Sequence, residues 1–177
     1  MGGVAVLARP GPSAYTGGMV RGEAVSGSNT VLSDDGVAWQ TFSSAGGATC
    51  FFRVEGRALE NVIVGHMDAP VAERLMHEFD LVERAHGTFV GFHSWLQAPT
   101  YSTEYRGLWM KWLADKNQSG SLKETHFLTA SRIVRMGLTV ANIAYPKIRF
   151  GIHETEPSYL AARRVFMTDA TTPPPRR

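Results

Sequence analysis

The segment Thr125–Leu138 reads THFLTASRIVRMGL and contains the change of periodicity that decides the fold. Lys123–Leu128 has the length of a strand, and a helical pattern follows from Ser131 to about Ala144. Pro146 follows and favours a break after this helix. The segment therefore predicts a strand that leads directly into a helix.

The residues before this segment repeat the same alternation. Asp68 is a candidate N-cap for a helix whose apolar face recurs at helical spacing and which ends at Gly87. Thr88–Trp95 is a short apolar run suited to a buried strand. Thr100, Ser102 and Thr103 are candidate caps for a second helix, whose apolar face contains Tyr101, Tyr105, Leu108, Trp109, Trp112 and Leu113.

Further strands and a helix complete the pattern at both ends. Cys50–Val54 and Leu59–Val64 read as two strands joined by the turn Glu55–Arg57. Lys147–His153 alternates like a strand, and Glu156–Met167 reads as a closing helix capped by Thr155. The predicted order is β-β-α-β-α-β-α-β-α. It indicates an α/β domain with a mostly parallel sheet and one antiparallel N-terminal strand.

This element order resembles that of the STAS, or SpoIIAA-like, domains of the anti-sigma-factor antagonists. The Thr125–Leu138 stretch looks like the family's fourth strand and the helix that follows it. The segment Phe89–Leu113 is also similar to bacterial STAS/SEC14-like proteins. The resemblance implies a regulatory or scaffold domain that contacts other proteins and has no catalytic activity.

The domain is predicted to span residues 48–168, between two segments of different composition. Residues 1–47 hold more than half of the 18 glycines, together with serines and short apolar islands at Val4–Leu7 and Val37–Phe42. This extension is expected to be either flexible or docked on the domain as an added strand. Residues 169–177 form a Pro/Arg tail whose prolines cannot enter a helix or sheet interior.

Composition narrows the class of protein. The 177 residues are 44% hydrophobic and 19% charged, a globular balance. A net charge of +2 with scattered basic residues disfavours a nucleic-acid surface. Cys50 is the only cysteine, which excludes an intramolecular disulfide. The lack of a long apolar run predicts no transmembrane segment, and a cytoplasmic protein is the expectation.

Two sets of residues are candidate functional sites. In the resembling family a phosphoacceptor lies where the third strand leads into the second helix. Here that junction offers the hydroxyls of Ser102, Thr103 and Thr100, without the Asp-Ser-Ser-Gly-like context of the family. These hydroxyls are either plain helix caps or a regulated phosphosite. The second set is aromatic and contains Trp95, Tyr101, Tyr105, Trp109 and Trp112. It either packs in the core with one partly covered tryptophan, or forms a surface for a protein partner or a second copy.

Two other functions stay open at this stage. A small apolar ligand or lipid carrier of SEC14-like type would need a pocket lined by residues such as Phe92, Trp95, Trp109 and Ile143. A weak hydrolase would use a cluster at the strand ends, formed by His66, Asp68 and either Ser94 or Ser131. The scattered histidines predict no metal site, and no sequence feature indicates a cofactor.

Overall fold

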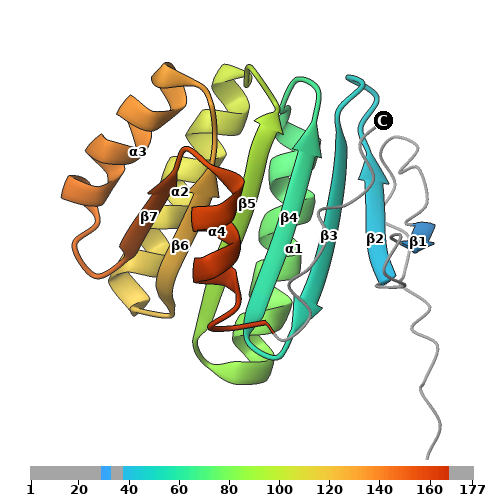
Figure 1. The fold of residues 1–177 in the computed structure, drawn as a ribbon. Helices are drawn as coiled ribbons and strands as arrows, with labels where there is room; N and C mark the ends of the chain where they lie inside the picture. The colour runs from blue at the N-terminus through green and yellow to red at the C-terminus, as the bar shows by residue number, and fades with distance from the viewer. Residues whose placement is uncertain (1–28, 33–37, 168–177) are drawn as a thin grey trace, which may run out of the picture.

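The computed structural model describes residues 29–32 and 38–167, which form one seven-stranded sheet with four helices (Figure 1). The spatial order of the strands is the order in which they occur in the chain. The strands are β1 (Asn29–Leu32), β2 (Ala38–Ser43), β3 (Thr49–Glu55), β4 (Ala58–Val64), β5 (Phe89–Gln97), β6 (Leu122–Leu128) and β7 (Arg149–His153). The helices are α1 (Ala69–His86), α2 (Thr103–Ser119), α3 (Arg132–Ala144) and α4 (Glu156–Arg163).

The sheet changes direction at β4. β1 to β4 pair antiparallel, whereas β4 to β7 pair parallel through the crossovers that α1, α2 and α3 provide. The predicted α/β class and the predicted order from β3 onward are confirmed. The sequence predicted one antiparallel strand at the N-terminal side, and the structure has three.

β2 falls in the glycine-rich extension. It pairs with β3, and its Trp39 and Phe42 side chains are buried on opposite faces of the sheet. Apolar burial of this kind compensates for the cost of ordering the segment. The island Val4–Leu7 and the Pro/Arg tail lie outside the described residues, so the domain boundaries stay a prediction.

The helices cover the sheet unequally. α1, α2 and α3 contribute to one large apolar core on one face, whereas α4 packs against the opposite face over Val90, Phe92 and Leu128 (Figure 1). The N-caps follow the sequence: Asp68 accepts a hydrogen bond from Val71 N, and Ser102 accepts one from Tyr105 N. α4 ends at Arg163 and continues as a turn, so it is shorter than predicted.

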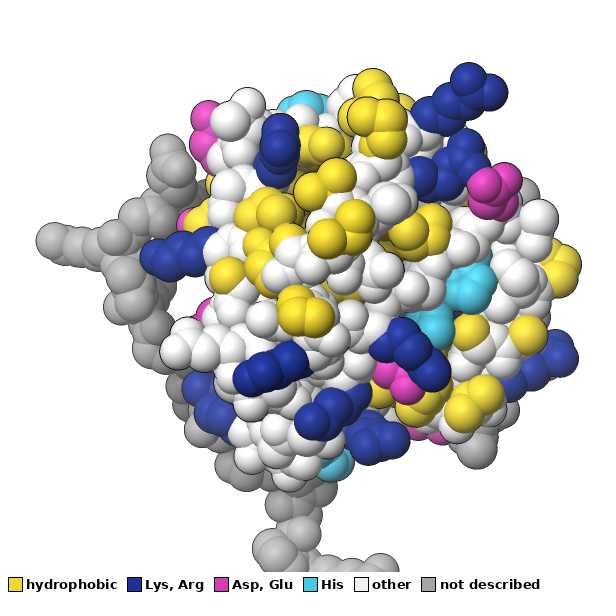
Figure 2. All heavy atoms as spheres, turned by 90° about the vertical axis from the view of Figure 1, so that its left-hand side faces the viewer, with side chains coloured by type: hydrophobic (Ala, Val, Ile, Leu, Met, Phe, Trp, Pro, Cys, Tyr) yellow, Lys and Arg dark blue, Asp and Glu magenta, His cyan; other side chains and the backbone are white. Residues whose placement is uncertain are grey.

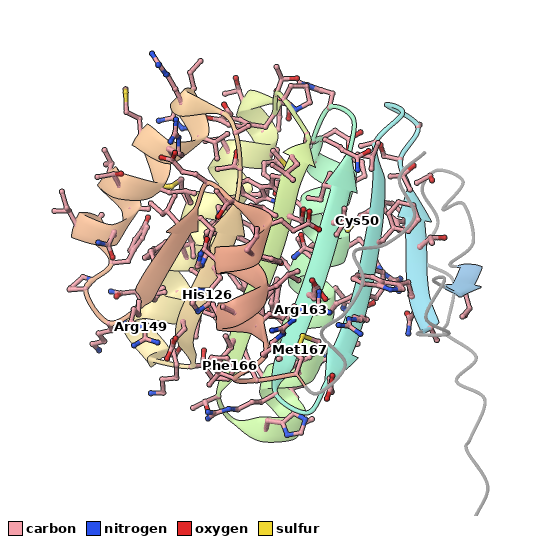
Figure 3. The ribbon with its side chains drawn as sticks, viewed as in Figure 1. Cys50, His126, Arg149, Arg163, Phe166 and Met167 are labelled. Carbon is pink, nitrogen blue, oxygen red and sulfur yellow. The ribbon has the colours of Figure 1, made fainter. Side chains whose placement is uncertain are left out.

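Buried ion pairs join distant parts of the chain. Glu60 on β4 accepts from Arg53 Nε at 2.9 Å and from Arg163 Nη1 at 2.8 Å. Arg163 projects from α4 toward the sheet, as Figure 3 shows. Because side chains this deeply buried lose their hydration, each charge needs the others to remain ionised. This network attaches α4 to the centre of the sheet.

Candidate functional site

A large groove lies between α2 and α3. Its volume is about 330 Å³, and most of its lining is apolar. Arg106 is the only charged residue in the lining. The lining residues are Trp95, Tyr101, Tyr105, Arg106, Trp109, Met110, Leu113, Ile133, Val134, Met136, Gly137, Leu138, Val140 and Ala141.

Beside the groove, α3 exposes a second apolar face. Its inner residues Val134, Leu138 and Ala141 are buried in the core. Its outer side chains Ile133, Met136, Val140 and Ile143 are 72%, 72%, 62% and 77% exposed. We call these four residues the α3 stripe. Figure 2 looks onto this side of the molecule, where hydrophobic side chains gather and Lys and Arg side chains surround them.

The segment after α3 is tied to the second half of α2. The Tyr145 hydroxyl donates to the carbonyl oxygen of Met110 at 3.1 Å. The Lys147 amide donates to Asn117 Oδ1 at 2.9 Å, and Lys147 Nζ donates to the carbonyl oxygen of Gln118 at 3.2 Å. These bonds fix the C-terminal end of α3 beside α2.

The predicted aromatic surface lies mostly in the core. Trp95, Tyr105, Trp109 and Trp112 are 5%, 2%, 5% and 8% exposed, and only Tyr101 is half-buried. Both tryptophans of α2 are therefore core residues. Trp95, Tyr105 and Trp109 pack against one another beneath the groove, with ring centroids 6.1–6.3 Å apart. A role for the five aromatic residues in partner binding stays a prediction.

Trp112 faces the other way, toward α1. Its ring packs against Phe79 and Phe89, and its Nε1 donates to Asp80 Oδ1 at 3.3 Å. Lys116, one turn later, forms ion pairs with Asp80 and Glu83 of α1. Although burial opposes it, hydrogen bonds to these carboxylates raise the pKa of Lys116. This end of the aromatic stripe thus holds α2 on α1.

The candidate phosphoacceptor loop is well anchored. Met67 N donates to the carbonyl oxygen of Thr100, and Ser102 N donates to that of Met67, at 3.1 and 2.8 Å. Thr100 Oγ1 lies 2.8 Å from His66 Nδ1, while Ser102 Oγ caps α2 at 3.0 Å from Tyr105 N. The Thr103 side chain is exposed at the first turn. The structure thus brings the three hydroxyls to one helix end.

A buried histidine lies beneath the same helix. Asn61 Nδ2 donates a hydrogen bond to the carbonyl oxygen of Phe92, which identifies this atom as the amide nitrogen. The same nitrogen lies 2.8 Å from His93 Nδ1, so His93 Nδ1 is the acceptor of its second hydrogen bond. Nε2 then carries the proton and donates to Thr125 Oγ1 at 3.0 Å. Burial, and in a smaller part the nearby His126, lower the pKa of His93 to about 3. The ring is a neutral part of the core.

Two more histidines, His126 and His153, lie on the α4 face of the sheet, and Figure 3 labels His126. His126 Nδ1 is 3.1 Å from His153 Nε2, and His126 Nε2 is 3.3 Å from Glu124, which also pairs with Arg149. Burial lowers the pKa of both histidines. His153 Nδ1 lies 3.1 Å from Ser158 Oγ. The Ser158 hydroxyl donates its proton to the Thr155 carbonyl oxygen, so it accepts the hydrogen bond from His153, and its side chain is exposed.

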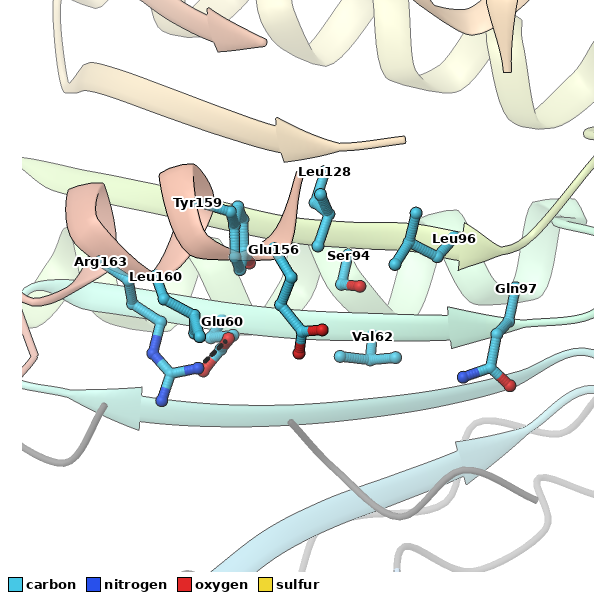
Figure 4. Close-up of a pocket in the computed structure, with 10 residues that line it drawn as sticks. All are labelled: Glu60, Val62, Ser94, Leu96, Gln97, Leu128, Glu156, Tyr159, Leu160 and Arg163. Carbon is cyan, nitrogen blue, oxygen red and sulfur yellow. Dashed lines mark hydrogen bonds and ion pairs between the residues drawn. The ribbon is translucent and has the colours of Figure 1, made fainter. Parts of the chain in front are cut away.

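The hydrolase cluster has other partners. His66 bonds Thr100, Asp68 caps α1, and Ser131 caps α3 through Val134 N at 3.4 Å. Ser94 lies in a hollow beside α4, whose residues are shown in Figure 4. The volume of that hollow is about 30 Å³, room for about one water molecule. No hydrogen bond among the described residues joins His66 to either serine, so this geometry gives no support to hydrolysis.

The pocket predicted for a carrier is partly wrong. Trp95 and Trp109 do line the groove. Phe92 lies on the opposite face of the sheet, where it stacks on His126 at 4.9 Å, because side chains alternate along β5. Ile143 is on the α3 stripe, outside the groove lining.

Within residues 29–32 and 38–167, no group of three or more His, Cys, Asp or Glu side chains could hold a metal ion. No described helix is both long and apolar enough to cross a bilayer.

Comparison with known proteins places the fold. An uncharacterised protein of the DUF3478 family from Shewanella loihica, with a SpoIIAA-like fold, is similar at a TM-score of 0.51 and 15% identity. The match covers 68% of this chain and 96% of that one. The chain has a SpoIIAA-like fold. The predicted STAS-type resemblance is therefore confirmed at the level of the fold.

A second solved structure is less similar to this chain. It is an anti-sigma factor antagonist from Mycobacterium paratuberculosis, with a TM-score of 0.45, 12% identity, and coverage of 70% of this chain and 99% of that one. No family model and no curated protein matches the sequence.

The α3 stripe is the feature of this SpoIIAA-like chain that sequence reasoning missed. The signal was present: α3 is apolar on two faces, one with Val134, Leu138 and Ala141 and the other with the stripe. A surface helix needs only one such face to pack on a core. The four aromatic residues of α2 and the loop before it, Tyr101, Tyr105, Trp109 and Trp112, are the stronger signal in the sequence.

Proposed function

We propose that this SpoIIAA-like chain is a non-catalytic regulatory module that binds a protein through α2, α3 and the loop before α2. The observation that carries the proposal is the α3 stripe next to the groove. Large apolar side chains that are more than half exposed, contiguous and rimmed by charged residues are typical of interaction surfaces. A small molecule seated in the groove would leave the outer side of the stripe in water, whereas a protein covers both.

Site-specific photo-cross-linking tests this proposal. A photoreactive phenylalanine analogue replaces Met136 in the middle of the stripe, or Leu81 on α1 as a matched control. Leu81 is also an exposed apolar residue, at 42%. Irradiation in cells is expected to give one identifiable protein adduct from position 136 and none from position 81. Adding Val140→Glu, at a side chain 62% exposed, should remove that adduct.

Identical adducts from both positions, or none from position 136, would contradict the proposal. Val140 makes little contact with the core, so loss of folding does not explain a negative result. Far-ultraviolet circular dichroism of the Val140→Glu protein provides the check on folding.

We further propose that phosphorylation at Ser102, or at Thr103 or Thr100, regulates this contact. Ser102 is the N-cap of α2, where backbone amides and the helix dipole favour an anion. A phosphate here would lie beside Tyr101 and Arg106, two residues of the groove lining. If the switch exists, Ser102→Glu changes recovery of the cross-linked partner while Ser102→Ala does not. Equal recovery with both would reject it.

The groove volume favours a second candidate, an apolar small molecule. About 330 Å³ meets the lower size of ligand pockets. The indole N–H groups of Trp95 and Trp109 have no acceptor among the described residues, and buried donors without partners are unusual. A ligand with an acceptor oxygen would satisfy them. Native mass spectrometry of the purified chain should then show an added mass that Leu138→Trp removes; a bare polypeptide mass rejects this candidate.

A further inference from the structure

The spacing of the α3 stripe identifies the shape of its partner. Ile133, Met136, Val140 and Ile143 follow one another at steps of three, four and three residues. This is the a/d spacing by which one helix packs against another, with β-branched residues at both a positions. Four such side chains on a helix of 13 residues cover nearly its whole length, about 20 Å.

A glycine at the edge of the stripe leaves room for a partner helix. Gly137 is in the middle of α3, lines the groove, and has no atom within 4 Å of the position where its Cβ would lie. Glycine destabilises a helix interior relative to alanine. No contact within the described chain requires a glycine at this position, and the open space beside it leaves room for close approach by another backbone.

The charged side chains that α3 itself contributes are of one sign. Arg132 and Arg135 are the only charged residues of α3, and Arg106 is the only charged residue of the groove. Glu154 pairs with Arg135, and the carboxylates of α2, Glu104 and Asp115, are outside the groove lining. A second copy of α3 would bring arginines and no carboxylate. The surface is therefore complementary to apolar residues flanked by acidic ones.

From these observations we infer that the α2–α3 face binds an amphipathic helix of another protein, whose apolar seam packs along the α3 stripe and whose flanking Glu or Asp residues meet Arg106 and Arg132. The inference rests on the proposed function and specifies its partner. The partner helix passes closest to α3 at Gly137, on the groove side of the stripe.

The test uses two synthetic 21-residue helical peptides with Leu and Ile at a/d spacing. One has Glu at the flanking positions and the other has Lys. Fluorescence anisotropy with the full chain is expected to show at least 10-fold tighter binding of the Glu peptide. Arg132→Glu should reduce that preference at least threefold. Equal affinities for the two peptides would overturn the inference.

A pair of glycine variants separates binding from folding. Gly137→Ala is expected to raise Tm by about 2 °C, because alanine is the better helix former, and to weaken Glu-peptide binding at least fivefold. Gly107→Ala is the matched control: Gly107 is also mid-helix with no atom within 4 Å of its Cβ position, and it is outside the groove lining. It should raise Tm equally and leave binding unchanged.

Unchanged peptide binding in Gly137→Ala would also overturn the inference. Sedimentation provides another test: a concentration-dependent dimer that Val140→Glu abolishes would also overturn the inference, because a second copy of the chain would then occupy the stripe. In that case the cross-link from position 136 would still form, and the proposed function would stand. Absence of any cross-link would remove the proposed function itself, so the two failures are distinguishable.

Discussion

Acidification is expected to destabilise the fold through His93. The ring is 1% exposed, and its Nδ1 already accepts a hydrogen bond from Asn61. A proton on that nitrogen would face an N–H donor inside the core. The folded chain therefore keeps His93 neutral, with a pKa of about 3, while the unfolded chain binds a proton near the ordinary histidine pKa of 6.5.

The sign and size of the effect follow from this difference. Below pH 6.5 the unfolded state binds one more proton than the folded state, so stability falls as pH falls, until the pH reaches the folded pKa of about 3. The slope is about 1.4 kcal/mol for each pH unit. Between pH 7.5 and 4.5, His93 alone removes about 3 kcal/mol of unfolding free energy.

Urea unfolding followed by tryptophan fluorescence measures this loss. His93→Gln lacks the titrating ring, so it should lose about 3 kcal/mol less than the natural chain between pH 7.5 and 4.5. Carboxylates and the pair His126–His153 contribute to both proteins. His77→Gln, at an exposed position of α1, serves as control and should follow the natural chain.

Parallel pH profiles for the natural chain and His93→Gln would refute the reasoning. They would mean that His93 binds protons equally in both states and is not held neutral by the core. A lower stability of His93→Gln at pH 7.5 is expected, because the ring stacks on Phe127 at 4.4 Å, and it does not affect the comparison of slopes.

Three further substitutions probe the rest of the fold. Glu60→Gln removes the buried carboxylate charge that Arg53 and Arg163 both contact, so urea unfolding should show a loss of about 3–5 kcal/mol. Ser102→Ala removes the 3.0 Å cap of α2, and a loss of about 1 kcal/mol is expected in the same assay; an unchanged midpoint would show that water replaces the cap. Gly151→Ala would place a Cβ 2.3 Å from His126 Nδ1, so thermal unfolding should show a loss of about 1–3 kcal/mol and NMR should show displaced His126 resonances.

The sequence predicted what depends on local patterns. The α2 cap at Ser102 and the strand–helix change around Ser131 follow from neighbouring residues, and both have their expected places. The Arg53–Glu60–Arg163 network could not be predicted, because Glu60 and Arg163 are 103 positions apart and charged residues are ordinarily on the surface.

The sequence predicted that residues of α2 belong to the candidate site, but it did not predict the α3 stripe. Periodicity indicates that α2 and α3 each have apolar faces, but it does not tell which face meets the sheet. Trp109 and Trp112 are large enough to be the best core residues available, and the structure buries them. Met136 and Val140 are as apolar as the buried residues beside them, so only packing distinguishes the exposed face from the inner one.

The identical order of strands in the sheet and in the chain has a consequence for biosynthesis. Each strand can join its predecessor as it leaves the ribosome, so β1 to β6 can assemble progressively. Glu60, however, must wait for Arg163, which is synthesised roughly 5–20 s later at ordinary elongation rates. Ribosome-bound chains with residue 140 or residue 170 exposed should therefore differ sharply in protease resistance. Until its last helix arrives, the nascent sheet holds Glu60 against Arg53 alone, and the apolar face over Val90, Phe92 and Leu128 stays uncovered.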